Sequence, residues 1–224
     1  MPAANMNHAS KTRMTRRSLS VFLGPHLFDR IARTVCQAGC LPRKELYESW
    51  EVARRVRRLF RGGRVVDLAC GHGLLAHILL VLDDTSPRAL AVDRNLPISA
   101  GKMTAAFQKE WPRLENRLNF RQTDLAAPVL DSDDLVVASH ACGALTDLVL
   151  ERATSAGARV AVLPCCHDLK TGVQGGLGGW LDGPLAIDTM RACYLRERGY
   201  RVYTRLIPAT ITPKNRLLIA EPHH

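Results

Sequence analysis

The stretch Arg64-Val65-Val66-Asp67-Leu68-Ala69-Cys70-Gly71-His72-Gly73 decides the fold of this 224-residue chain. Its first half is an apolar, β-branched run that predicts a buried strand, and two glycines spaced G-x-G follow it. The apolar run over 74–82 then predicts a helix directly after the turn. Because Gly71 and Gly73 lack a Cβ, the backbone can turn sharply there and come close to a ligand. The pattern is typical of a nucleotide-binding unit, and a plain strand-to-helix turn is the alternative.

The acid of this turn precedes the glycines, in the order D-x-A-x-G-x-G. That order resembles motif I of the class I S-adenosylmethionine (SAM) methyltransferases more than the G-x-G-x-x-G of dinucleotide-binding proteins. The resemblance implies SAM as the cofactor and a binding turn formed by Asp67, Ala69, Gly71 and Gly73. In it, Asp67 accepts hydrogen bonds from the loop or from the amino group of the ligand.

Strand and helix patterns alternate from residue 64 onward. Apolar runs predict seven strands, over 64–69, 88–94, 118–123, 135–139, 159–163, 200–207 and 216–220. Strands that alternate with helices predict a largely parallel, doubly wound sheet. The last two strands are joined by a connection too short for a crossover helix, so they are expected to be antiparallel neighbours. The predicted fold class is therefore Rossmann-like α/β, with a seven-stranded, mostly parallel sheet and an antiparallel last strand.

The composition sets limits on the class of protein. A hydrophobic content of 46% is sufficient for a real core, and no apolar run reaches the roughly 18 residues that a membrane span needs. The seven cysteines are scattered and odd in number, which favours free thiols in a reducing compartment. We therefore expect a cytoplasmic protein. Because residues 1–28 contain no acid, organellar import is an alternative.

The positive charge is concentrated at the front of the chain. Residues 1–64 contain 14 Lys and Arg and 4 acids, whereas residues 65–224 contain 17 of each, so the net charge of +10 lies ahead of the glycine turn. Such an excess favours a polyanionic partner, most often nucleic acid. A solubilising basic tail is the alternative.

Three segments are predicted from these patterns: a disordered basic arm over 1–20, a basic helical extension over 21–62, and a catalytic domain over 63–224. The extension contains an amphipathic helix over 44–60. Its second half carries the arginines for which we predict contact with RNA phosphates, and a solvated surface is the alternative: Arg54, Arg55, Arg57, Arg58 and Arg61.

Polar residues follow the predicted strands, and ligands of a doubly wound sheet bind beyond the carboxyl ends of its strands. Asp93 ends the second strand and can accept hydrogen bonds from both hydroxyls of a ribose. Asp124 ends the third strand and can accept from an adenine amino group. The predicted cofactor site also includes the neighbouring residues Arg94, Leu125 and Ser139.

Two further loops combine histidines, cysteines and acids. Ser139-His140-Ala141-Cys142-Gly143, with Thr146 and Asp147, follows the fourth strand, and Pro164-Cys165-Cys166-His167-Asp168 follows the fifth. The patterns H-x-C-G-x-x-T-D and C-C-H, with the late run Thr212-Pro213-Lys214-Asn215, resemble the eukaryotic tRNA 2′-O-methyltransferases of the acceptor stem and related methyltransferase-like proteins. The resemblance covers about residues 64–220. The chain departs from these enzymes at Asp168, where they have a second histidine, and it lacks their N-terminal zinc modules.

The resemblance implies an enzyme that transfers a methyl group from SAM, with an RNA ribose hydroxyl as the leading acceptor. His140 is the candidate base, Asp147 would hold it, and Lys214 would stabilise the developing alkoxide. A small-molecule or protein methyltransferase is the main alternative. An RNA cytosine-C5 methyltransferase would use Cys142 and Cys165, and a binding protein without turnover is a further alternative. We expect no metal, because adjacent cysteines rarely both reach one tetrahedral zinc site.

Overall fold

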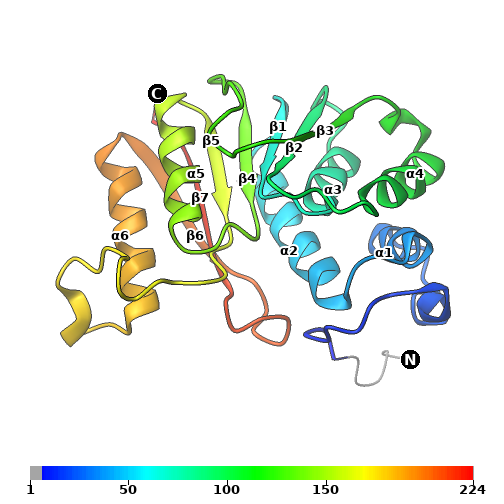
Figure 1. The fold of residues 1–224 in the computed structure, drawn as a ribbon, viewed down its shortest axis with the longest axis horizontal. Helices are drawn as coiled ribbons and strands as arrows, with labels where there is room; N and C mark the ends of the chain where they lie inside the picture. The colour runs from blue at the N-terminus through cyan, green and yellow to red at the C-terminus, as the bar shows by residue number, and fades with distance from the viewer. Residues whose placement is uncertain (1–6, 224) are drawn as a thin grey trace.

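The computed structural model describes residues 7–223 and contains one seven-stranded sheet (Figure 1). The order of the strands is β3-β2-β1-β4-β5-β7-β6. The strands are β1 (Val65–Leu68), β2 (Ala89–Asp93), β3 (Leu118–Gln122), β4 (Leu135–Ala138), β5 (Arg159–Val162), β6 (Tyr200–Leu206) and β7 (Arg216–Pro222).

Strands β1 to β5 are parallel, and β7 runs antiparallel to both of its neighbours. Ala220 of β7 pairs with Val160 of β5 and with Val202 of β6. The short connection after β6 forces this hairpin, since no helix can carry the chain back to the other end of the sheet. The predicted fold class is confirmed.

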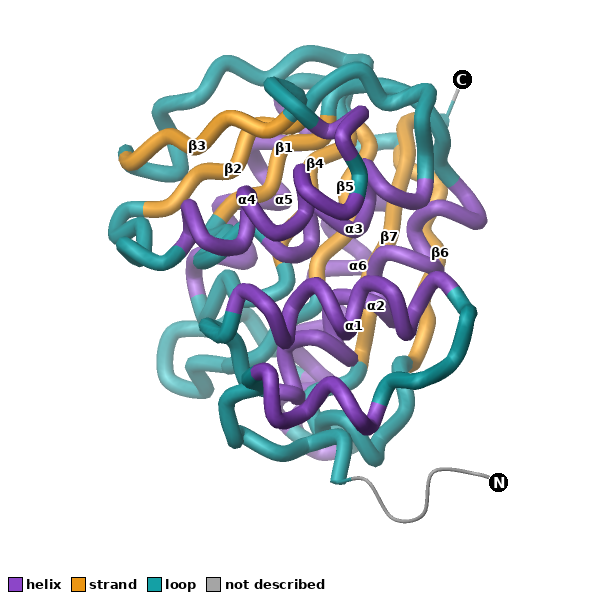
Figure 2. The backbone as a smooth tube through the Cα atoms, turned by 90° about the vertical axis from the view of Figure 1, so that its right-hand side faces the viewer, coloured by secondary structure: helices purple, strands orange, loops and turns teal. Residues whose placement is uncertain are grey.

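Helices cover both faces of the sheet, because alternate side chains of each buried strand point to opposite sides. Val65 and Val137 face one core, with helices α1 to α4, whereas Val66 and Val136 face the other, with α5 and α6. Figure 2 shows α1, α2 and α4 on the near side of the molecule in that view. The helices are α1 (Leu27–Ala38), α2 (Arg43–Leu59), α3 (Leu74–Leu82), α4 (Ala100–Glu110), α5 (Ala144–Ser155) and α6 (Gly183–Glu197), with short 3-10 turns at Arg16–Val21, Pro112–Leu114 and Leu177–Gly179.

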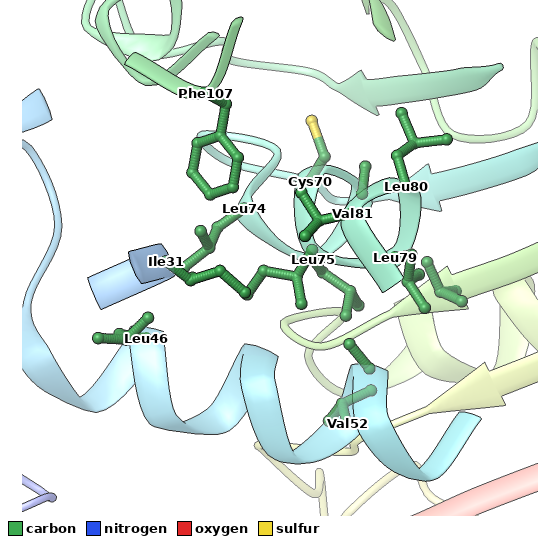
Figure 3. Close-up of a cluster of buried hydrophobic side chains, with 14 of the residues drawn as sticks. Ile31, Leu46, Val52, Cys70, Leu74, Leu75, Leu79, Leu80, Val81 and Phe107 are labelled. Carbon is green, nitrogen blue, oxygen red and sulfur yellow. The ribbon is translucent and has the colours of Figure 1, made fainter. Parts of the chain in front are cut away.

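The N-terminal part of the chain is built into the first of these cores. Ile31, Leu46 and Val52 are fully buried and lie against the apolar helix α3 (Figure 3). Met14 is 1% exposed, and its backbone N–H donates to the carbonyl of Leu41 at 2.8 Å. The structure therefore differs from the predicted disordered arm over residues 7–20, while residues 1–6 lie outside the described part.

The apolar stripe of α2 accounts for this packing, because it needs a partner surface and α3 offers one.

None of the helices described is long and apolar enough to cross a membrane.

A buried histidine makes the stability of this core depend on pH. His77 of α3 is 1% exposed and donates from Nδ1 to the carbonyl of Gly73 at 2.7 Å, while its Nε2 has no hydrogen-bond partner. Burial lowers the pKa of His77 to about 4. The unfolded chain takes up this proton near pH 6.5, but the folded chain takes it up only near pH 4. The His77 contribution is thus complete above about pH 6.5 and is lost as the pH falls toward 4.

We expect the free energy of unfolding to fall by about 1–2 kcal/mol more between pH 7 and pH 5 in the native protein than in His77→Phe. Urea denaturation at both pH values measures this difference. Other titrating groups are common to the two proteins, so the comparison isolates His77. An equal loss in both proteins would show that His77 does not carry the pH dependence.

Candidate active site

The turn after β1 adopts the conformation that its glycines allow. Ala69, Gly71 and Gly73 have φ angles of 59°, 52° and 68°, in the left-handed region. A Cβ at position 73 would lie 2.8 Å from the ring of Phe120, so only glycine fits against the sheet there. A Cβ at position 71 would meet no described atom within 4 Å. Position 71 therefore lies on the open side of the turn, and it is the φ angle of 52° that favours glycine there.

Two carboxylates support this turn in different ways. Asp93 is half-buried, and its carboxylate accepts hydrogen bonds from the backbone N–H of Gly71 at 2.9 Å and of Asn95 at 3.0 Å. Asp67 is 1% exposed and accepts from the backbone N–H of Ala76 at 3.3 Å. Burial, opposed by that hydrogen bond and aided by Asp93, raises the pKa of Asp67 to about 7. Asp67 therefore holds the start of α3 from behind the turn, and the accessible carboxylate is that of Asp93.

The remaining predicted cofactor residues lie at the ends of β2, β3 and β4. Arg94 and Asp124 are both exposed and form an ion pair with an N–O distance of 2.6 Å. A hydrogen bond from the backbone of Ala126, followed by the contact with Arg94, lowers the pKa of Asp124. Leu125 and Ser139 are buried, at 2% and 6% exposure. The carboxyl ends of parallel strands meet at one edge of the sheet, hereafter the carboxyl edge.

His140 follows β4 at the carboxyl edge and lies near the start of α2. Burial lowers the pKa of His140, with the charge of Glu48 opposing this shift and that of Lys44 adding to it. Its ring makes no hydrogen bond within residues 7–223. His140 is therefore neutral at pH 7 and has a free nitrogen that can accept a proton.

The structure corrects the predicted role of Asp147. Its carboxylate forms two hydrogen bonds to the guanidinium of Arg191, at 2.7 and 3.0 Å, and none to His140. Arg191 of α6 is 5% exposed and also donates to the carbonyl of Gly143 at 3.0 Å. Asp147 therefore fixes α6 against the start of α5 and does not hold the candidate base.

Asp188 of α6 is the centre of a set of ion pairs that the sequence patterns did not reveal. Its carboxylate pairs with His167 Nε2 at 2.7 Å, with Arg216 at 2.6 Å and with Arg191 at 3.2 Å. His167 follows β5, and Arg216 begins β7. Asp188 thus connects three segments that meet behind the loops of the carboxyl edge. His167 and Arg216 are 21 and 28 residues from Asp188 in the sequence, and Arg191 is three residues away on the same helix. The only sequence signal near this set of ion pairs is therefore the C-C-H pattern that contains His167.

Lys214 lies in the connection between β6 and β7. Since β7 is antiparallel to β5 and begins at Arg216, this connection is at the carboxyl edge, where β5 ends. Lys214 is exposed, and no ion pair of its side chain is found within residues 7–223. It shares the edge with His140 but does not contact it in this structure.

The loops after β4 and β5 bring three cysteines together. The Sγ atoms of Cys142, Cys165 and Cys166 all lie within 4.8 Å of one another. A hydrogen bond of 3.1 Å from the N–H of Gly143 to the carbonyl of Cys166 joins the two loops.

Only part of the predicted phosphate-binding surface of α2 is accessible: Arg58 and Arg61 are exposed, whereas the other arginines of the set are buried or paired. Arg57 is 2% exposed and pairs with Asp83 at 3.0 Å, so it cannot reach a phosphate. Desolvation lowers the pKa of Arg57 to about 10, and Asp83 opposes that shift. Arg54 and Arg55 both pair with Glu51. The guanidinium of Arg61 donates at 2.8 Å to the carbonyl of Leu82, and Leu82 is the last residue of α3.

The C-terminal half of α2 is also far from the carboxyl edge. Helix α2 starts near His140, and the chain after it leads directly into the beginning of β1. A helix of 17 residues is about 25 Å long. Its last arginines therefore lie toward the opposite edge of the sheet, where the parallel strands begin.

A different set of cations lies at the carboxyl edge. The backbone N–H groups of Arg43 and Lys44 donate to the carbonyls of Thr12 and Ser10, which fixes the N-terminal segment beside the start of α2 (Figure 1). Burial and then the charge of Arg13 lower the pKa of His72 in the glycine turn. The exposed basic residues of this segment are Lys11, Arg13, Arg16 and Arg17.

Comparisons with known proteins agree with the fold. A family model described as a methyltransferase domain matches residues 45–171, more than half of the chain. An O-methyltransferase family protein from Burkholderia thailandensis is 17% identical, with a TM-score of 0.52 over 94% of this chain and 63% of its own. A SAM-dependent O-methyltransferase from Thermotoga maritima is 13% identical, with a TM-score of 0.51 over 89% and 72%. A precorrin-6y C5,15-methyltransferase from Geobacter metallireducens GS-15 is 13% identical, with a TM-score of 0.50 over 78% and 87%.

This chain spans less than two thirds of the Burkholderia protein. A comparison with curated proteins gives no significant match. The strand order and the glycine turn define a class I methyltransferase fold. The chain belongs to the methyltransferase-domain family. SAM is the cofactor that the resemblance of the glycine turn implies.

The residues at the carboxyl edge fit this cofactor. The carboxylate of Asp93 offers acceptors to a pair of ribose hydroxyls, beside a turn whose Gly71 leaves room for a ligand. The exposed carboxylate of Asp124, at the end of β3, remains the candidate acceptor for an adenine amino group, although it is paired with Arg94 in this structure. A sulfonium is a cation, and the accessible carboxylate of Asp93 suits it.

Proposed function

We propose that this enzyme methylates RNA, at a ribose 2′-hydroxyl. The observation that carries the proposal is the position of the basic N-terminal segment, because hydrogen bonds from the backbone N–H groups of Arg43 and Lys44 hold it beside the start of α2, near the carboxyl edge. Phosphates of an RNA would be attracted to this segment and so to the carboxyl edge. The H-x-C-G-x-x-T-D pattern from His140 to Asp147 supports the same acceptor, through its resemblance to the tRNA 2′-O-methyltransferases.

In this reaction the side chains of the enzyme supply orientation, a proton acceptor and a stabilising cation. Bound SAM supplies the methyl group from its sulfonium. Asp93 and the glycine turn orient the nucleoside part, so that the acceptor oxygen and the methyl carbon can be held in line. A ribose hydroxyl is a weak acid, and neutral His140 is the side chain at this edge that can accept its proton. Lys214, from the β6–β7 connection, is the candidate cation for the developing alkoxide.

A second acceptor class is favoured by a cavity. A pocket of about 370 Å³ lies between α5, α6 and the glycine-rich segment that follows β5. Its lining is mostly apolar and includes Gly143, Asp147, Thr171, Ile187 and Met190. A pocket of this size suits a small molecule. This cavity is the specific observation in favour of a small-molecule acceptor.

Product identification separates the acceptor classes. We expect radiolabelled SAM to label the RNA fraction of a cell extract, and nuclease digestion to yield a 2′-O-methylated nucleoside. His140→Ala should lower turnover by about 10²-fold, because a general base contributes on the order of 10² to 10⁴, while SAM affinity changes little. Label in the metabolite or protein fraction alone would contradict the RNA proposal. Label at cytosine C5 would instead favour Cys142 and Cys165 as the reacting pair.

Two matched variants test where the RNA binds. Replacing Lys11, Arg13, Arg16 and Arg17 by glutamine should weaken RNA binding and flatten its dependence on salt, by about 0.7–0.9 in the log–log slope for each phosphate that is no longer neutralised. Replacing Arg54, Arg55, Arg58 and Arg61 by glutamine removes the same charge from the far end of α2 and should change both quantities less. Filter binding over a series of salt concentrations measures both variants. A larger effect of the α2 set would move the RNA to the opposite edge of the sheet.

A further inference from the structure

The three cysteines at the carboxyl edge form a cluster that the methyl transfer described above does not use. Cys142 lies in the loop after β4, and Cys165 and Cys166 lie in the loop after β5. The sulfurs of Cys142 and Cys165 are 2.6 Å apart, and the third sulfur completes a triangle whose sides are all within 4.8 Å. No fourth His, Cys, Asp or Glu within residues 7–223 belongs to this cluster.

Packing does not account for these side chains. A structural cysteine is ordinarily buried as a small hydrophobe, as Cys36 is here with 0% exposure. In contrast, Cys142 and Cys166 are exposed, and Cys165 is only partly buried. Three sulfurs from two loops are therefore gathered at an accessible position, where they can act as ligands.

Hydrogen bonds and ion pairs support the two loops from behind. The guanidinium of Arg191 donates to the carbonyl of Gly143, next to Cys142, at 3.0 Å. Asp188 binds both Arg191 and His167, and His167 directly follows Cys166. Fixed loops of this kind reduce the entropy that a metal site must otherwise lose on binding its ion.

We propose that Cys142, Cys165 and Cys166 bind one zinc ion. Thiolates are preferred zinc ligands, at a Zn–S distance of about 2.3 Å, which places tetrahedral sulfurs about 3.8 Å apart. The separation of 2.6 Å between Cys142 and Cys165 is shorter than that value, and no sulfur is more than 4.8 Å from another, so small rotations of the exposed side chains would complete the site. The backbone brings the adjacent Cys165 and Cys166 toward one point, which removes the objection that led us to expect no metal.

Three protein ligands leave the fourth zinc position open, which is the arrangement of catalytic rather than structural zinc sites. An open zinc position takes a water or a substrate oxygen and lowers the pKa of that group. The open position would lie beside Cys142, which is two residues after His140 in the sequence. It would therefore be at the carboxyl edge, where we propose that the acceptor binds. The zinc site goes beyond the proposed RNA specificity and does not depend on it.

Metal analysis tests the site directly. The full-length protein, purified under reducing conditions without chelator, is expected to contain about one zinc per chain. Cys142→Ser and Cys166→Ser should each lose most of it, because both residues are exposed and their replacement should not disturb the fold. Cys193→Ser is the matched control, since Cys193 lies in α6 outside the cluster, and it should retain the zinc. Replacement of zinc by cobalt should give a thiolate-to-cobalt charge-transfer band in the native protein and in Cys193→Ser only.

Two results would overturn the proposal. One is a reduced, folded protein that binds neither Zn²⁺ nor Co²⁺ at micromolar concentration, with mass spectrometry showing a Cys142–Cys165 disulfide once the reductant is removed. The other is a Cys142→Ser/Cys166→Ser double variant that still retains zinc. Both results come from metal content and spectra, so they are independent of the methyl acceptor.

Discussion

Asp93→Ala is expected to lower the affinity of the enzyme for SAM by about 10²- to 10⁴-fold. A carboxylate that accepts from two ribose hydroxyls makes two charge-assisted hydrogen bonds, each of about 1.5–3 kcal/mol. The substitution also removes the acceptor of the Gly71 N–H, at 2.9 Å, so the glycine turn loses part of its support. Isothermal titration calorimetry with SAM measures the loss.

The controls separate binding from folding. Asp93→Asn keeps the shape and one acceptor oxygen and should lose less affinity than Asp93→Ala. Asp131→Ala removes an acid whose side chain is 71% exposed. Asp131 precedes β4 and so lies at the edge where the parallel strands begin, opposite the carboxyl edge. This variant should bind SAM normally. A folded Asp93→Ala protein with native affinity would exclude Asp93 from the cofactor site.

The fold was predictable because its signals are local. The central strands β1, β2, β4 and β5 are short, mostly apolar runs, and the connection of residues 207–215 is too short for a crossover helix. Both facts can be read without knowing which segments meet in space. The prediction of the turn at Gly71 and Gly73 is of the same kind, since left-handed backbone favours glycine and both residues adopt it.

The burial of Arg57 also had a local signal. It lies four residues after Ala53 and seven after Trp50, so helical spacing places it on the same stripe as Leu46 and Phe60. We interpreted the residue by its charge and predicted a phosphate contact. Its position on the helix indicated a buried ion pair, which Asp83 supplies.

The partners of Asp147 and His167 had no such signal. Arg191 is 44 residues from Asp147, and Asp188 is 21 residues from His167. Only the packing of α6 beside the loops of β4 and β5 brings these groups together. Ion pairs of this kind depend on the relative placement of whole elements, which residue patterns along one helix do not contain.

The ion pairs of Asp188 with His167, Arg191 and Arg216 give the largest expected effect on the free energy of unfolding. Asp188→Ala should lower the free energy of unfolding by about 3–5 kcal/mol, because removing one member of a buried ion pair leaves the others uncompensated. Asp188 has 11% of its side chain exposed, and its partner His167 has 2%. The substitution leaves His167 without its Nε2 partner, although its Nδ1 already lacks one. Arg216 also loses its ion pair. Urea denaturation monitored by circular dichroism measures the change.

The matched controls test whether the network, and not the loss of any acid, is responsible. Asp131→Ala removes an exposed acid 3.5 Å from Arg64 and should cost less than about 1 kcal/mol, as surface ion pairs do. Asp188→Asn keeps acceptor and donor atoms in place and should fall between the two. Because Asp188 lies behind the loops of β4 and β5, and not at the glycine turn, the folded Asp188→Asn protein should bind SAM almost normally while its turnover falls. Equal stability of Asp188→Ala and Asp131→Ala would mean that Arg191 and Asp147 alone hold these loops together.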